Sequence, residues 1–67
     1  MALKAWCKGE EFRASLRRDG HIQFKQTLFD SPSAAAKAAA GRGMRGWLFW
    51  HFRDSRGEWV ALDNLKR

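Results

Sequence analysis

Arginine is the residue type that carries most of the chemistry in this sequence of 67 residues. Its guanidinium group is a planar fork of N–H donors that fits a phosphate or the edge of a guanine, whereas lysine offers a point charge. Arginine outnumbers lysine by eight to five, and the formal net charge is +6. This bias predicts contact with a polyanion such as nucleic acid. A basic surface without a partner is the alternative.

The basic residues that we expect to contact phosphates lie on the outward face of a predicted hairpin or in loops and turns beside an aromatic segment. They are Arg13, Arg17, Lys25, Arg42, Arg45 and Arg53. Three glycines in residues 41–46 would let the backbone approach a duplex closely. A flexible loop without a ligand is the competing interpretation of this segment.

Trp47 and Trp50 are the predicted base contacts. In a strand over residues 47–53 they point to opposite faces, so at most one of them lies fully in the core. The other could stack on an extruded or single-stranded base, or lie against a methyl group in the major groove. A purely structural role is the alternative for both rings. Ser31 and Ser33, at the start of a predicted helix, offer hydroxyls and helix N–H groups to a further phosphate.

No combination of residues predicts catalysis or metal binding. His21 and His51 are 30 positions apart and Cys7 is the single cysteine, so neither a nucleophile with its base nor a zinc-binding set is indicated. Glu10 and Glu11 are neighbours that project to opposite sides of a strand, which does not suit a pair of catalytic carboxylates. We therefore expect no enzymatic activity, no metal and no cofactor.

The elements that must position these residues follow from the hydrophobic pattern. Residues 11–18 alternate between apolar and polar side chains, as in a half-buried strand. Asp19-Gly20 predicts a type I′ turn, and residues 21–25 form the return strand. Residues 28–29 extend this pairing or form a further short strand.

A short helix follows. Ser31 as N-cap and Pro32 at the first helical position predict a helix whose body spans residues 33–40 and contains six alanines. Gly41 ends it as the C′ residue. A helix of this length is not stable alone in water, so it must pack against the sheet.

The last part of the chain predicts a second hairpin. Residues 47–53 form an aromatic strand, residues 54–57 a turn and residues 58–62 the return strand. Asp63 caps a last turn over residues 64–67. The fold class is therefore α+β: a small antiparallel sheet of two hairpins with one short Ala-rich helix packed on a face, in the order β-β-(β)-α-β-β.

The length of 67 residues predicts a single domain spanning 1–67. Four tryptophans and five phenylalanines supply the buried area that so small a core needs. There is no run of 18 apolar residues, and residues 1–6 are too short for a signal peptide. We expect a cytoplasmic protein without membrane contact, associated with the nucleoid if the source is bacterial.

Two segments resemble the RAMA (restriction enzyme adenine methylase associated) domain. They are residues 29–38, Phe-Asp-Ser-Pro-Ser-Ala-Ala-Ala-Lys-Ala, followed by Gly41, and residues 46–50, Gly-Trp-Leu-Phe-Trp. The family pattern is a hairpin, a Ser-Pro-Ser-x-Ala-Ala-Lys helix, a glycine-containing loop and a Gly-Trp-x-Phe-Trp strand, and the resemblance covers residues 9–65. Arg45 stands where many members carry Asn, so hydrogen bonding at that position is lost or becomes a phosphate contact.

The resemblance implies a domain that accompanies DNA methylases, nucleases and other restriction components. With the charge, it predicts a DNA-binding module and, more narrowly, a reader of methylated DNA in restriction-modification or other DNA-processing systems. The expected partners are duplex DNA and a nuclease or methylase. Two alternatives stay open: a protein-interaction module that docks a nuclease or methylase through an exposed aromatic face, and an RNA or single-strand binder.

Overall fold

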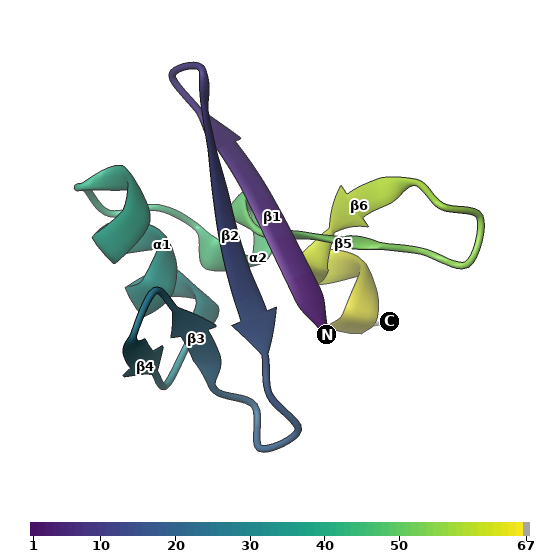
Figure 1. Cartoon of the computed structure of the whole chain (residues 1–67), viewed down its shortest axis with the longest axis horizontal. Coiled ribbons are helices and arrows are strands. Elements are labelled where there is room, and N and C mark those ends of the chain that lie inside the picture. The colour runs from purple at the N-terminus through teal and green to yellow at the C-terminus, as the bar shows by residue number, and fades with distance from the viewer. Residues whose placement is uncertain (67) are drawn as a thin grey trace.

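A computed structural model describes residues 1–66 and shows one antiparallel six-stranded sheet with helices α1 and α2 packed against one face (Figure 1). The strands are β1 (Ala2–Cys7), β2 (Glu10–Leu16), β3 (Ile22–Phe24), β4 (Thr27–Phe29), β5 (His51–Arg53) and β6 (Trp59–Ala61). The helices are α1 (Pro32–Ala40), α2 (Gly46–Phe49) and a terminal 3-10 helix, η1 (Leu62–Lys66). In space the strands follow the order β4-β3-β2-β1-β5-β6.

β1 is the strand that the sequence analysis missed, and it lies near the centre of the sheet between β2 and β5. Its side chains alternate, because Leu3 and Ala5 are buried while Trp6 is 48% exposed. The α+β class holds, but the expected arrangement of two hairpins around a helix is wrong. β1 pairs with both halves of the chain and joins them into one sheet.

The turns also differ from expectation. A type I′ turn joins β1 to β2, because Lys8 and Gly9 both have positive φ, 51° and 80°. Residues 17–21, which join β2 to β3, use a different turn: Gly20 has a φ of 90°, and its N–H donates to the Arg17 carbonyl at 3.1 Å. Asp19 does not adopt positive φ, so the predicted type I′ turn is wrong, while the antiparallel pairing of β2 with β3 is confirmed.

The short strand predicted at residues 28–29 is β4, which pairs with β3. Lys25 lies in the two-residue turn between these strands and has a φ of 57°. The predicted return strand over residues 21–25 is therefore one residue too long at this end, because β3 ends at Phe24.

The predicted helix is confirmed as α1, and so are its caps. The Ala34 N–H donates to Ser31 Oγ at 3.1 Å, and Gly41, with a φ of 78°, donates its N–H to the Lys37 carbonyl at 2.8 Å. Two of its alanines are fully buried, so the helix backbone lies close to the large side chains of the sheet.

The predicted strand over residues 47–53 is wrong in its first half, where the chain forms α2. Gly46, the first residue of α2, lies against α1 so closely that a Cβ there would be 2.0 Å from the carbonyl carbon of Pro32. After this contact the helical turn directs both Phe49 and Trp50 into the core. The alternation of a strand would have sent them to opposite faces.

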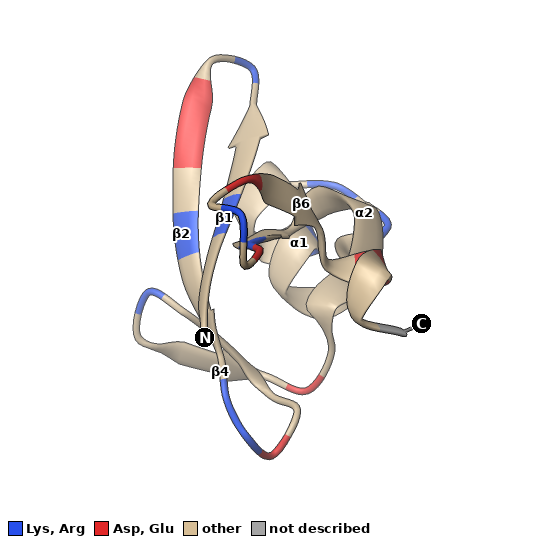
Figure 2. Cartoon of the chain, turned by 90° about the vertical axis from the view of Figure 1, so that its right-hand side faces the viewer, with Lys and Arg blue, Asp and Glu red and all other residues tan. Residues whose placement is uncertain are grey.

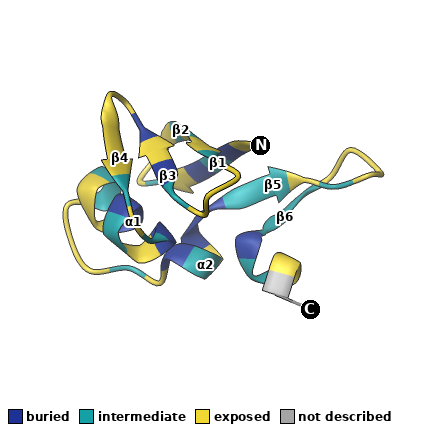
Figure 3. Ribbon diagram, turned by 90° about the horizontal axis from the view of Figure 1, so that it is seen from below, coloured by how far each residue is buried: buried dark blue, intermediate teal, exposed yellow. Residues whose placement is uncertain are grey.

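The core lies between the sheet and the two α-helices, where the buried positions meet (Figure 3). Its largest fully buried side chains are Trp50, Leu3, Ile22 and Leu62. The predicted second hairpin is present as β5 and β6, and its turn over residues 54–57 is confirmed. The predicted last turn over residues 64–67 belongs to η1, which begins earlier, at Leu62. Asp63 therefore lies within η1, so its predicted role as the cap of this turn is wrong, and Arg67 lies outside the described residues.

Candidate nucleic-acid interface

The residues expected to contact phosphates are divided between the two faces of the molecule. Lysines and arginines lie on β1 and β2, at the hairpin turns and in the loop that precedes α2 (Figure 2). A nucleic-acid interface therefore has to be defined by the residues that the fold actually brings together.

Several of the predicted residues meet around Trp47. Its ring lines a hollow of about 290 Å³ together with Leu16, Arg17, Arg18, Gly20, Pro32 and Leu65. It also lines a second hollow of about 280 Å³ together with Ser33, Arg45, Leu48 and Asp63. The two hollows share Trp47, so their lining residues are neighbours around this side chain. We call Arg17, Arg18, Ser33, Arg45 and Trp47 the Trp47 surface.

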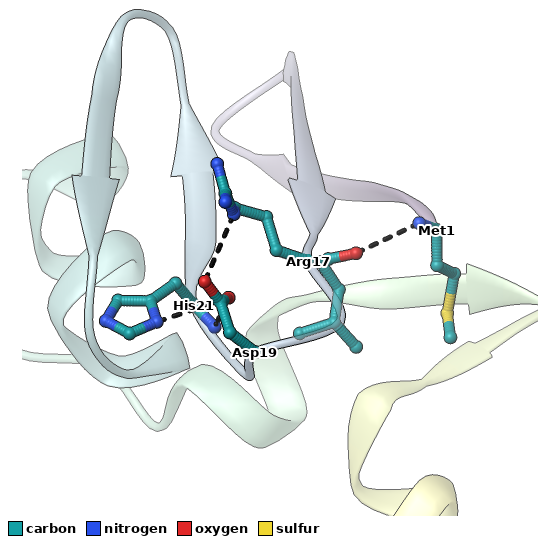
Figure 4. Close-up of polar contacts among 5 residues, drawn as sticks. Met1, Arg17, Asp19 and His21 are labelled. Atoms are coloured by element: carbon teal, nitrogen blue, oxygen red, sulfur yellow. Dashed lines mark hydrogen bonds and ion pairs between the residues drawn. The ribbon is translucent and has the colours of Figure 1, made fainter.

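Arg17 is held in place by the loop between β2 and β3 (Figure 4). Its Nε lies 3.4 Å from Asp19 Oδ2, and the His21 backbone N–H donates to Asp19 Oδ1 at 3.1 Å. This hydrogen bond, assisted by the charge of Arg17, holds the pKa of Asp19 below its usual value of 3.8. The ion pair is exposed, and such pairs contribute little to stability, so Arg17 can exchange Asp19 for a phosphate at small cost.

Arg42 and Arg45 lie on the exposed loop between α1 and α2. Among residues 1–66, no carboxylate forms an ion pair with either of them. Arg45 is the N-cap residue of α2, but its side chain makes no capping hydrogen bond. Both guanidinium groups are therefore available to an external anion.

Ser31 and Ser33 use their hydroxyl oxygens within the fold. Ser31 Oγ caps α1, and Ser33 Oγ accepts the Gly46 N–H at 3.3 Å. Gly46 covers the first turn of α1, since a Cβ there would lie 2.3 Å from the Ser33 nitrogen. The expected phosphate site at the N–H groups of this helix is therefore blocked by the chain itself. Ser33 still reaches the Trp47 surface through the second hollow.

Trp50 is not accessible to a base. It is 0% exposed, and its Nε1–H donates to the Pro32 carbonyl at 3.1 Å. Its ring centroid lies 5.0 Å from that of Phe49 and 5.8 Å from that of Phe24. The predicted base contact at Trp50 is wrong, because the helical turn of α2 carries this ring into the core. Trp47 is half-buried and packs against the edge of the core.

Arg13, Lys25 and Arg53 do not line either hollow of the Trp47 surface. Arg13 Nε donates to Glu11 Oε2 at 2.9 Å on the outer side of β2, and Arg53 Nε donates to the Gly57 carbonyl at 3.1 Å. Lys25 lies in the turn between β3 and β4. The fold does not place these three residues with Arg45 and Trp47.

An aromatic group that was not predicted from the sequence lies on the sheet face opposite α1 and α2. The ring centroid of Trp6 lies 5.4 Å from that of His51 and 6.2 Å from that of Trp59, and Lys4 Nζ lies 5.0 Å from the Trp59 centroid. We call Lys4, Trp6, His51 and Trp59 the open-face cluster. The alternation of residues 2–7 indicates that Lys4 and Trp6 share a face, but only once this segment is recognised as a strand.

The chemistry that these surfaces offer is the binding of anions and flat rings. Within residues 1–66, no three His, Cys, Asp or Glu side chains are grouped so that they could hold a metal ion. No helix in that range is long and apolar enough to span a bilayer. The polar and aromatic groups that line the two hollows are the guanidinium groups of three arginines, one serine hydroxyl, the Trp47 indole and the Asp63 carboxylate.

Comparison with known families gives one result for the chain. The family model described as Restriction Enzyme Adenine Methylase Associated matches residues 3–67, which is essentially the whole sequence. No curated protein and no solved structure matches the chain.

Proposed function

The chain belongs to the restriction enzyme adenine methylase associated (RAMA) family, and from this membership we propose that it is a DNA-binding module without catalysis of its own. The family description associates it with adenine methylases of restriction systems, and the substrate of such methylases is DNA. In our proposal, a basic domain that accompanies such a methylase holds the duplex.

The observation that carries the proposal is the Trp47 surface. Three arginines from the β2–β3 loop and the α1–α2 loop surround an aromatic ring and a serine hydroxyl, and Arg42 lies on the same α1–α2 loop. Two carboxylates, Asp19 and Asp63, lie at or near its hollows. Because the four arginines outnumber them, the local charge stays positive. Cations beside a ring match the phosphates and bases of a nucleic acid.

A narrower form of the proposal is that the surface distinguishes methylated from unmethylated DNA. The first hollow is lined by the apolar side chains Leu16, Pro32, Trp47 and Leu65, with Arg17 and Arg18 beside them. An apolar contact favours a methyl group on a base edge, while the arginines bind the backbone next to it. In this proposal Trp47 contacts the base, and four arginines contact phosphates: Arg17, Arg18, Arg42 and Arg45.

Salt-dependent binding to a duplex tests the proposal. With four arginines on phosphates, the slope of log K against log salt should be about −3.6. The double variant Arg42→Glu with Arg45→Glu should weaken binding at least tenfold and reduce the slope by about 2. The control is the double variant Lys8→Glu with Arg56→Glu, whose positions lie at the tips of two other hairpins. Both double variants lower the formal net charge from +6 to +2, so they differ only in where the charge is removed. Equal loss in the two doubles would mean that net charge alone drives binding.

The reader function has its own comparison. Affinities for unmodified, N6-methyladenine and cytosine-methylated duplexes should differ in the original chain and become equal in Trp47→Ala. Equal affinities in the original chain would leave a general DNA binder.

Docking of a nuclease or methylase is a second candidate function. Leu48 and Leu65 are 52% and 43% exposed and line the two hollows that share Trp47. Exposed apolar side chains around a ring are typical of protein contacts. This function predicts that Leu48→Ser abolishes capture of a methylase partner while duplex binding stays unchanged.

A further inference from the structure

The sheet has a second face that α1 and α2 do not cover, and its side chains can be assigned from the strand register. Lys4 on β1 is opposite Arg13 on β2 and His51 on β5, and Trp6 is opposite Glu11. In an antiparallel sheet such partners lie on the same face. Trp59 joins them, since its ring lies 6.2 Å from Trp6. This face therefore combines rings and charges from strands that are distant in sequence.

The aromatic part of the open-face cluster is accessible and fixed. Trp6 is 48% exposed, although it is a large apolar side chain. Its plane makes angles of 63° with His51 and 81° with Trp59, so both contacts are edge-to-face. Such contacts hold the indole without a parallel ring lying over it. The indole is therefore held by two neighbouring rings while about half of it stays accessible to a ligand.

The charged part of this face is positive. Lys4 Nζ lies 3.8 Å from Glu11 Oε2, and Arg13 Nε lies 2.9 Å from the same oxygen. One carboxylate is thus shared by two cations. The hydrogen bond from Arg13, with the charge of Lys4, holds the pKa of Glu11 below its usual value of 4.5. Glu11 orients both cations next to Trp6 and leaves one unit of positive charge uncompensated.

We infer that the open-face cluster binds single-stranded nucleic acid, with one base stacked on Trp6 and its neighbouring phosphates held by Lys4 and Arg13. An indole on a flat sheet face can stack only on a base that is not covered by its own duplex neighbours. A protein interface is disfavoured here, because Lys4 and Glu11 lie beside the ring and lysine and glutamate are depleted at the centre of such interfaces. The inference uses none of the residues of the Trp47 surface, so it stands or falls separately from the proposed duplex binding.

The test measures binding of a short labelled oligothymidylate by fluorescence anisotropy, with oligouridylate of the same length as a second probe. Trp6→Ala should weaken oligothymidylate binding about tenfold, and Trp6→Phe should restore part of it, because phenylalanine still stacks. Leu28→Ala is the matched control: Leu28 is also 48% exposed, and its partner Gln23 places it on the same face, but it has no ring. Equal affinity of the two probes assigns the site to either nucleic acid, and a difference identifies the preferred one.

Glu11→Gln provides a second measurement that does not depend on removing the ring. The substitution frees Lys4 and Arg13 from a competing carboxylate, so oligothymidylate affinity should rise severalfold and the salt dependence should steepen. Thermal melts of all variants show whether the fold is kept. Unchanged oligothymidylate binding in Trp6→Ala, or the same loss in Leu28→Ala, would overturn the inference. If oligothymidylate binding is lost in the double variant Arg42→Glu with Arg45→Glu but kept in Trp6→Ala, the single-strand site is the Trp47 surface and the inference is wrong.

Discussion

At the scale of the residue, Gly46 determines where the aromatic segment goes. The hydrophobic pattern of residues 47–53 suits a strand, and nothing in it marks a helical turn. Gly46 packs on the backbone of Pro32, and the Trp50 indole N–H donates a hydrogen bond to the carbonyl of the same residue. These two contacts between residues distant in sequence hold α2 in place. Periodicity could not have found these contacts, so the sequence alone left open which of Trp47 and Trp50 lies in the core, and the fold places Trp50 there.

Two glycines of the same loop give a matched test of this contact. Gly46→Ala places a Cβ within 2.0 Å of Pro32 backbone, which cannot move aside as a flexible side chain would, so the free energy of unfolding should fall by about 3 kcal/mol. Gly43→Ala meets nothing within 4 Å and should change it by no more than about 0.5 kcal/mol. Urea unfolding of both variants measures the difference. Equal stability would show that the contact with Pro32 is not rigid.

At the scale of the element, the sequence predicted those elements whose signals are local. The helix α1 was correct in its caps, and the β2–β3 and β5–β6 hairpins were correct in their pairing, because capping residues and glycine turns act over a few positions. β1 was not predicted because it is held by pairing with β2 and β5, and the second of these strands is distant in sequence. The same limit applies to the candidate site: Arg17, Arg45 and Trp47 were each identified, but only the fold shows that they meet and that Arg13 does not join them.

Two substitutions of Ser31, the N-cap residue of α1, should affect the stability of the fold and the affinity for DNA differently. Ser31→Ala removes the acceptor for the Ala34 N–H and should lower the free energy of unfolding by about 1 kcal/mol. Ser31→Asp keeps an acceptor and should preserve stability, but it adds a negative charge beside Pro32, which lines the first hollow. Duplex affinity should therefore fall in Ser31→Asp and stay near the original in Ser31→Ala. Calorimetry and anisotropy on both variants check this, and equal affinities would place the duplex away from α1.

At the scale of the whole molecule, the positive charge is spread over both sides of one thin sheet. The Trp47 surface includes residues of α1 and α2, which lie on one side of the sheet (Figure 2). The open-face cluster lies on the other side, as the strand register shows. Ion pairs within residues 1–66 compensate part of the charge. They join Lys4, Arg13, Arg17 and Arg56 to the carboxylates of Glu11, Asp19 and Asp54. These carboxylates restrain self-repulsion of a chain whose formal net charge is +6. The stability of the fold should therefore depend on their ionisation.

Acid should destabilise the protein through these three groups. The hydrogen bond from Arg13 lowers the pKa of Glu11, and backbone hydrogen bonds from His21 and Glu58 lower the pKa values of Asp19 and Asp54. The folded values lie below the usual 4.5 and 3.8, so on acidification the unfolded chain takes up protons first. The stabilisation is complete above the usual values and is lost as the pH falls through the folded ones.

The melting temperature should therefore stay level from about pH 7 to about pH 5 and fall below about pH 4. Asp54→Asn should make this decline shallower, because an amide oxygen can still accept the Arg56 and Glu58 N–H groups but does not titrate. Asp30→Asn is the control, since the Asp30 carboxylate accepts no hydrogen bond from any residue in the range 1–66. Thermal melts followed by circular dichroism across this pH range measure the three curves. A decline as steep in Asp54→Asn as in Asp30→Asn would show that the β5–β6 turn does not contribute to the acid response.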